Sequence, residues 1–212
     1  MTFKDRTDAA LRLAKKMENL QDEDPVILAI PRGGVVTGDV IAKELGARLD
    51  IIVSRKIGAP YNPELAIGAV MHDGTFFPNI DIIEALNVPR EYIEREIRSE
   101  LKEIERRLTK FRGNSDYKLQ NRTVVLVDDG IATGATMFAA IEWVRRQHPK
   151  RLIVAVPVGP RETIEKISKV AEVVVLEAPQ FFNAVGEFYN EFEQVEDYRV
   201  VEILRQYGYG SK

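Results

Sequence analysis

The chain has 212 residues, of which 45% are hydrophobic and 30% charged, which excludes a disordered chain, a collagen-like repeat and a coiled-coil rod. Its 30 basic and 33 acidic residues give a net charge of −3, so no overall basicity indicates a nucleic-acid partner. The absence of cysteine excludes disulfides and thiolate metal sites. Because no apolar run reaches about 18 residues and the N-terminus has no signal-peptide pattern, we expect a cytoplasmic protein without a membrane span.

The first part of the chain alternates apolar segments with glycine and proline turns. In chain order it predicts a helix at 6–20, a strand at 26–31, a turn at 31–34, a helix at 35–46, a strand at 49–54, a loop at 55–64 and a hairpin at 65–78. The loop is predicted from its two prolines, one glycine and one asparagine. The hairpin is predicted from Asp73-Gly74, a pair typical of tight turns.

The second part begins with a long amphipathic helix at 89–111, whose apolar residues recur every three or four positions. This stripe either packs on the protein's own core or forms a seam for a partner helix. The remaining predicted elements are a strand at 123–130, a helix at 134–147, a strand at 151–159, a helix at 161–169, a strand at 171–179 and two short helices in the tail. Alternating strands and helices predict an α/β fold, with a parallel sheet covered by helices on both faces. We expect one domain over 1–212, with a helical insertion at 79–118 and a C-terminal tail at 180–212.

Ligands of open parallel sheets bind beyond the carboxyl ends of the strands. Four segments directly follow predicted strands: PRGG at 31–34, RKIGAP at 55–60, DDGIATGAT at 128–136 and APQFF at 178–182. These segments are therefore the candidate site.

The strongest local signal is the string VVLVDDGIATGAT at 124–136. An apolar strand ends at two carboxylates, and a loop of small residues then leads into a helix. Such a loop offers backbone N–H groups and a helix N-terminus to an anion, and Thr133 and Thr136 add hydroxyl donors. The adjacent acids suit neutral hydroxyls or a cation. A ribose 5-phosphate with a metal ion satisfies both requirements.

Two known motifs with a similar outline fit this string less well. A Walker A loop would need a lysine after Gly134, and the chain has alanine there. A receiver-like domain carries its acids after the first strand, whereas here two strands and a hairpin come earlier. A plain acidic turn between a strand and a helix is the remaining alternative.

VVLVDDGIATGAT resembles the binding signature for phosphoribosyl pyrophosphate (PRPP) of type I phosphoribosyltransferases. Together with RGG, RKIGAPYNPELAIGAV and AVPVGP, it resembles a branch described only as predicted phosphoribosyltransferases, over about residues 25–180. The resemblance implies that fold, with a mobile flap at the loop from Arg55 to Glu64 beside the hairpin, and Mg²⁺-dependent transfer of phosphoribose from PRPP to a nitrogenous base.

The resemblance also assigns roles to residues. Asp128 and Asp129 would hold the ribose hydroxyls, assist catalysis and contact the metal indirectly, and Lys56 and Arg55 would approach the pyrophosphate from the flap. The early turn would bind pyrophosphate through Pro31, Arg32, Gly33 and Gly34, although Arg32 also reads as a solvated turn residue. The signature loop would wrap the 5-phosphate through Gly130, Ile131, Ala132, Thr133, Gly134, Ala135 and Thr136. Phe181 or Phe182 could stack on the base, or both could belong to the core.

One position departs from part of the family. Members that use 6-oxopurines carry an acid three residues after the second signature acid, where this chain has Ala132. No acid of this loop therefore serves as general base, and the acceptor base stays open. The alternative function is a PRPP or nucleotide sensor without turnover, as in regulators that reuse this fold. We expect a homodimer that binds PRPP and a small base, and no nucleic acid.

Overall fold

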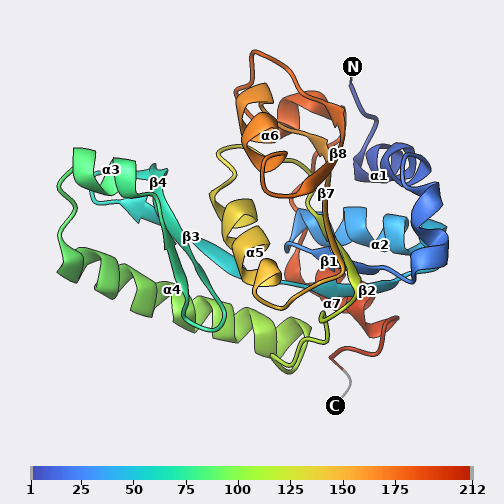
Figure 1. The fold of residues 1–212 in the computed structure, drawn as a ribbon, viewed down its shortest axis with the longest axis horizontal. Coiled ribbons are helices and arrows are strands. Elements are labelled where there is room, and N and C mark those ends of the chain that lie inside the picture. The colour runs from blue at the N-terminus through green and yellow to red at the C-terminus, as the bar shows by residue number, and fades with distance from the viewer. Residues whose placement is uncertain (1, 211–212) are drawn as a thin grey trace.

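A computed structural model describes residues 2–210, so that Met1 and residues 211–212 of the predicted tail lie outside the described residues. Its centre is a five-stranded parallel sheet in the order β2 (Arg48–Ile51), β1 (Val26–Ala29), β6 (Thr123–Val127), β7 (Arg151–Val158) and β8 (Glu172–Glu177). Helices lie on both faces of this sheet (Figure 1). The predicted α/β fold is confirmed.

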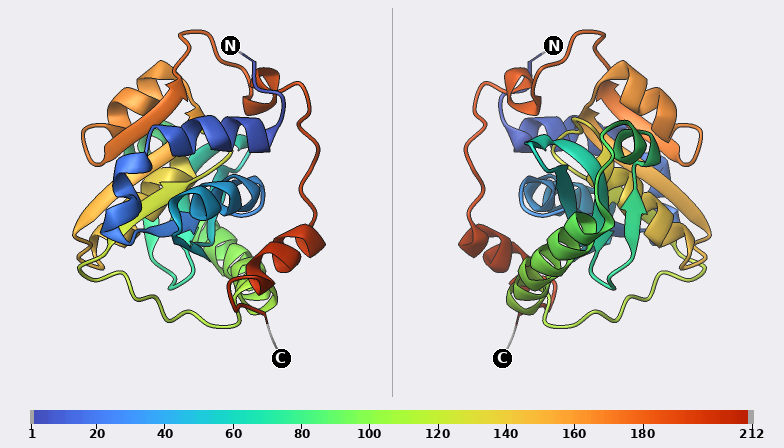
Figure 2. Two further views of the ribbon diagram at one scale, coloured as in Figure 1. Left: turned by 90° about the vertical axis from the view of Figure 1, so that its right-hand side faces the viewer. Right: turned by 90° about the vertical axis from the view of Figure 1, so that its left-hand side faces the viewer.

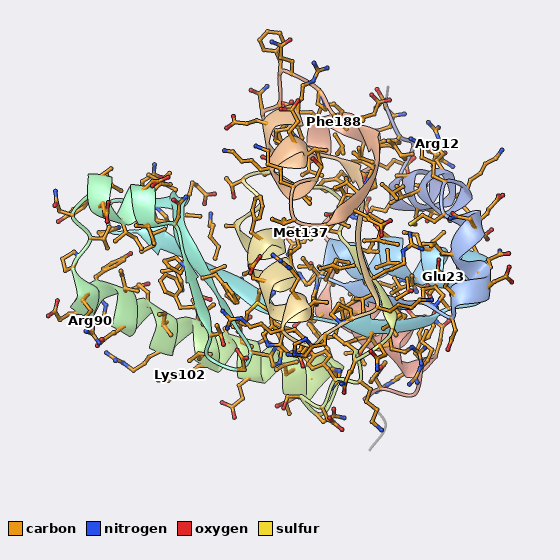
Figure 3. All side chains as sticks on the ribbon, viewed as in Figure 1. Arg12, Glu23, Arg90, Lys102, Met137 and Phe188 are labelled. Carbon is orange, nitrogen blue, oxygen red and sulfur yellow. The ribbon has the colours of Figure 1, made fainter. Side chains whose placement is uncertain are left out.

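The two faces of the sheet are covered by different helices. One core contains Ile27 and Ala29 of β1, and the other contains Val26 and Leu28, because successive strand residues point to opposite faces. The first core is closed by α1 (Arg6–Lys15) and α2 (Gly33–Leu45), and the second by α5 (Ala135–Arg145) and α6 (Arg161–Ile167). Figure 3 shows Met137 between α5 and the sheet. Burial on both faces explains why the strands are continuous apolar runs.

An arm beside the main sheet carries a second, antiparallel sheet (Figure 1). Its strands are β3 (Ser54–Ala59), β4 (Asn62–Met71) and β5 (Phe76–Pro78), followed by α3 (Ile80–Ala85) and the long α4 (Arg90–Phe111). The hairpin with the Asp73-Gly74 turn is confirmed, because β4 pairs with β5 across it. Arg90 and Lys102 lie on the outer side of α4 (Figure 3).

The predicted loop at 55–64 is wrong, because this segment is a hairpin of β3 and β4. Lys56 pairs with Ala69 and Ala59 with Asn62, and the register shifts around Gly58 absorb the irregular residues. Proline and glycine suggested a loop, but buried Ile57 packs in the main core and the Tyr92 hydroxyl donates to the Gly58 carbonyl oxygen at 3.0 Å. Tertiary packing of α4 therefore overrides the local preference.

The start of the chain meets the first part of the C-terminal tail, whereas the N and C ends of the chain lie at opposite ends of the molecule (Figure 2). Phe3 forms an isolated bridge with Tyr189, and the tail then contains the short helices η2 (Val185–Phe188) and α7 (Asp197–Arg205), as predicted. The predicted helix at 6–20 ends at Lys15, and a 3₁₀ helix, η1 (Glu18–Glu23), follows. No helix within residues 2–210 is both long and apolar enough to cross a membrane.

The long helix α4 uses its apolar stripe internally. Ile104, Leu108 and Phe111 are buried in the main core, while Ile93 and Ile97 are half-buried against it. Of the two interpretations of the stripe, packing on the protein's own core accounts for these residues.

Candidate functional site

The site lies where strand order changes direction in the main sheet. β1 and β6 are neighbours in parallel register, with Ala29 opposite Val127, and the Ile30 N–H donates to the Val127 carbonyl oxygen at 2.9 Å. From β1 the chain continues to β2 on one side, and from β6 to β7 on the other. Such a switch point separates two connecting segments and leaves a crevice at the strand ends. The two loops predicted from the sequence therefore lie side by side there.

The early glycine turn approaches the acid pair too closely for any side chain. A Cβ atom on Gly33 would lie 1.8 Å from Oδ2 of Asp129, and one on Gly34 would lie 2.9 Å from the Val127 carbonyl oxygen. Glycine is therefore required by contact with the second loop rather than by a left-handed backbone. The peptide between Pro31 and Arg32 is cis, and α2 begins at Gly33.

Asp128 and Asp129 are both partly buried at the end of β6. The Asp129 N–H donates to Oδ1 of Asp128 at 2.8 Å. Burial, followed by the nearby charge of Asp129, raises the pKa of Asp128 well above the ordinary aspartate value. The Tyr189 hydroxyl donates to the Asp129 carbonyl oxygen at 2.6 Å, and burial raises the pKa of Tyr189. The pair therefore includes one aspartate, Asp128, that holds its proton more tightly than an exposed aspartate does.

The signature loop combines an anchored start with an exposed turn. Ile131 is buried, and its N–H donates to the Val158 carbonyl oxygen at 2.9 Å. Ala132 and Thr133 are exposed, and Gly134 adopts a φ of +81° immediately before α5. The free N–H groups at the start of α5 consequently lie beside the loop, in the arrangement that binds anions.

A cavity of about 480 Å³ opens next to Asp128. Its lining includes five residues predicted for the site, namely Pro31, Arg55, Lys56, Asp128 and Thr136. It also includes five residues that the sequence did not single out, namely Ser54, Tyr92, Glu96, Glu100 and Arg107. Tyr92, Glu96 and Glu100 are spaced four residues apart and so share a face of α4, which was a detectable signal. Larger cavities of about 570 and 620 Å³ lie elsewhere, and Asp128 lines neither.

The cations around this cavity are paired with acids. Arg55 donates to Glu100 at 2.5 Å, Lys56 to Glu64 at 3.1 Å and Arg107 to Glu103 at 2.7 Å. Each of the three cations already has an acidic partner, and Glu96 and Asp128 also line the cavity, so a polyanion entering here would exchange partners with the protein's own carboxylates. A divalent cation brought with the anion would offset the charge of those carboxylates.

Three of the predicted residues point elsewhere. Arg32 lies 3.5 Å from Asp197 of α7, so its charge is shared with the tail. Phe181 is 88% exposed, and Phe182 stacks on Phe188 with ring centroids 5.5 Å apart. Within residues 2–210, the lining of the 480 Å³ cavity includes neither phenylalanine.

Two residues that contact the acid pair or the adjoining Gly130 were not predicted from the sequence. Arg6 of α1 donates through Nε to Oδ2 of Asp129 at 2.7 Å. Val185 of the tail packs against Gly130, where a Cβ atom would lie 2.4 Å from Cγ1 of Val185. Both residues are distant in sequence from the signature and follow no local pattern that would have indicated them.

The fold, the switch point and the paired acids define a phosphoribosyltransferase-like protein, and comparison with known families agrees. The family model for the phosphoribosyl transferase domain matches residues 4–192. The chain therefore belongs to the phosphoribosyl transferase domain family.

Relatives of known sequence or structure support this membership. Two provisionally named phosphoribosyl transferases from Mycobacterium tuberculosis, of strains CDC 1551 and H37Rv, are each 40% identical over 204 residues, covering 95% of this chain and 46% of theirs. The chain thus spans about half the length of these curated relatives.

Solved structures show the same fold. The protein TT1426 from Thermus thermophilus is 41% identical, with a TM-score of 0.82 over 98% of this chain and 99% of that one. A purine phosphoribosyltransferase from Pyrococcus horikoshii is 19% identical, with a TM-score of 0.51 over 89% of this chain and 90% of that one, and shares the fold.

Proposed function

We propose that the protein transfers phosphoribose from PRPP to a nitrogenous base and releases pyrophosphate. The observation that supports this most strongly is the contact between the glycine turn at Gly33 and the acid pair at the switch point. It joins the segment expected for pyrophosphate to the segment expected for ribose 5-phosphate within one crevice, in a chain of the phosphoribosyl transferase domain family.

Each part of PRPP has a chemically suitable partner. The backbone N–H groups of residues 132–136, which include the start of α5, suit the 5-phosphate. Asp128 and Asp129 suit the ribose hydroxyls, which donate hydrogen bonds. The turn from Pro31 to Gly34 offers backbone donors to pyrophosphate, and Arg55 and Lys56 line the adjoining cavity.

The reaction needs positioning and charge stabilisation more than a covalent intermediate. The bond between C1 of the ribose and the pyrophosphate oxygen breaks, positive charge develops on the ribose, and a nitrogen of the acceptor base forms the new bond to C1. Negative charge on the acid pair of Asp128 and Asp129 would favour the developing positive charge. The acceptor's proton leaves to solvent or to a residue outside the signature loop, because the loop has Ala132 where an acid would assist.

The acids present fit Mg²⁺ held mainly by the ligand. Within residues 2–210, no group of three or more side chains could hold a metal by itself. Mg²⁺ typically binds through one or two carboxylates, water and substrate phosphates, and Asp128 and Asp129 provide such a carboxylate pair. When bound, the ion would neutralise charge on the leaving pyrophosphate.

The remaining expectations concern the acceptor and the assembly. Phe181 and Phe182 remain candidates for stacking on the base, although a rearrangement of the tail would be needed to bring them to the cavity. A homodimer and a cytoplasmic location remain predictions of the sequence.

The proposed reaction is tested by pyrophosphate release. The protein is incubated with PRPP and Mg²⁺ and a panel of purine, pyrimidine and pyridine bases, and Asp129→Asn is assayed beside it. Asp116→Asn is the matched control, because it makes the same chemical change in an exposed segment after α4. We expect base-dependent release that Asp129→Asn abolishes and Asp116→Asn leaves intact. PRPP binding without release for any base would instead support the sensor function.

A further inference from the structure

Arg6 contacts the acid pair through Asp129, although 123 positions separate the two residues in the sequence. Its Nε donates to Oδ2 of Asp129 at 2.7 Å, and the two side chains are only 11% and 15% exposed. The same Nε is 3.1 Å from the position of a Cβ atom on Gly33. Arg6 therefore stands where the glycine turn and the signature strand meet.

The guanidinium group of Arg6 is held from the opposite side by the tail. Nη1 donates to the Glu193 carbonyl oxygen at 2.8 Å, and Cζ lies 3.9 Å from the ring centroid of Phe192. These contacts fix the group in one place and orientation, which an exposed arginine would not have. A site residue that is fixed in this way is preorganised for its partner.

The backbone around Arg6 is also tied to the tail. The Phe3 N–H donates to the Phe188 carbonyl oxygen at 2.7 Å, and the Asn190 N–H donates to the Phe3 carbonyl oxygen at 2.8 Å. The start of the chain and the tail run side by side above the sheet (Figure 2). The N-terminal segment is thus built into the site, although the motifs that carry the resemblance in the sequence begin only near residue 25 and the family model matches from residue 4.

We propose that Arg6 is a positioning residue of the phosphoribose site, which holds the Asp129 carboxylate in one orientation over the Gly33 turn. This inference rests on the proposed function. The bond from Nε of Arg6 fixes the Asp129 carboxylate from one side, while the Gly33 turn limits the space around Oδ2. The carboxylate therefore keeps one orientation, in which it would accept a hydrogen bond from a ribose hydroxyl. The ligand class is accordingly a phosphorylated sugar with a vicinal diol.

The test compares PRPP affinity in wild type, Arg6→Met, Arg6→Gln and the conservative variant Arg6→Lys. Arg6→Met keeps the apolar packing on Phe192 and removes the charge. Lys15→Met is the matched control, because Lys15 is an exposed cation on the same helix. Affinities are measured by calorimetry with Mg²⁺, and melting temperatures show whether each variant is folded.

We expect Arg6→Met and Arg6→Gln to bind PRPP at least about tenfold more weakly, since a charge-assisted contact is lost. We also expect Arg6→Lys to recover part of the lost affinity, because it restores a cation beside Asp129. A residue that only stabilised the fold would change the melting temperature without this dependence of affinity on the charge. Lys15→Met should match wild type.

The outcomes separate this inference from the function on which it rests. If the wild-type protein does not bind PRPP, the proposed function is wrong and the inference falls with it. If wild type binds but a folded Arg6→Met or Arg6→Gln variant retains affinity within twofold, only the inference on Arg6 is overturned. Arg6→Gln supplies the same comparison if Arg6→Met fails to fold.

Discussion

The Asp129 carboxylate fills the space that a side chain at Gly33 would need, because a Cβ atom on Gly33 would lie 1.8 Å from Oδ2 of Asp129. The glycine turn can lie against the acid pair only because this position has no side chain. The relationship couples the two ends of the proposed PRPP site, and it makes the acid's orientation depend on a residue 96 positions earlier in the chain.

The first prediction therefore concerns Gly33→Ala. The added methyl group should displace the Asp129 carboxylate and break its bond to Arg6, which lowers PRPP affinity by at least about tenfold. Calorimetric titration with PRPP measures the effect, and the melting temperature shows whether the fold is retained. Wild-type affinity in a folded Gly33→Ala protein would show that the close contact has no part in binding.

The second prediction concerns the cost of burying Asp128. Its pKa is raised in the folded protein, so the folded state binds a proton more readily than the unfolded chain. The free energy of unfolding therefore falls as pH rises from the ordinary aspartate value toward the raised pKa, by about 1.4 kcal/mol for each tenfold difference in proton affinity.

Asp128→Asn removes that cost, and it should raise the melting temperature at pH 8 while it abolishes PRPP binding. The stability difference from wild type should shrink as pH falls below the ordinary aspartate pKa. Thermal unfolding between pH 3 and pH 9 measures it. A variant that is less stable than wild type at pH 8 would contradict the assigned direction of the pKa.

The third prediction concerns the contact between Gly130 and Val185. Gly130→Ala would place a methyl group 2.4 Å from Cγ1 of Val185, so we expect it to destabilise the fold by about 1–3 kcal/mol. Val185→Ala should relieve the overlap in the double variant. Urea unfolding of wild type, both single variants and the double variant gives the coupling free energy. Purely additive effects would mean that the tail does not pack on this loop.

The fourth prediction concerns Arg107 of α4, which lines the same cavity as Asp128 and Lys56. If the cavity receives pyrophosphate, Arg107→Gln should raise the KM for PRPP about tenfold or more, because one cationic donor is lost. Arg98→Gln is the control, because Arg98 is an exposed cation of the same helix that does not line this cavity. Equal KM values for the two variants would exclude Arg107 from substrate binding.

Much of the fold could be predicted because its strands carry local signals. The runs that became β1, β6, β7 and β8 are apolar and bounded by turns, and burial on both faces of a parallel sheet produces such runs. The glycine turn and the acid pair could also be predicted, since each directly follows one of these strands. The parallel register that brings them together follows from the strand order.

The remaining features depend on contacts that no local pattern encodes. The hairpin at 55–64 carries proline and glycine, and it forms strands because α4 packs on it and Tyr92 bonds to Gly58. Arg6 contacts Asp129 and Val185 contacts Gly130, and both residues are far from the signature in the sequence. Only the folded structure shows that they belong to the site. Arg107 lies on one of several polar positions of α4, and only the packing of that helix shows which of them meet the cavity.

Calorimetric titration with PRPP determines whether Asp128 and Asp129 form the proposed PRPP site. Wild type and the Asp128→Asn, Asp129→Asn double variant are titrated with PRPP in the presence and absence of Mg²⁺. We expect Mg²⁺-enhanced binding by wild type and its loss in a folded double variant. Equal binding by both proteins, or no binding by wild type at millimolar PRPP, would contradict the proposed site.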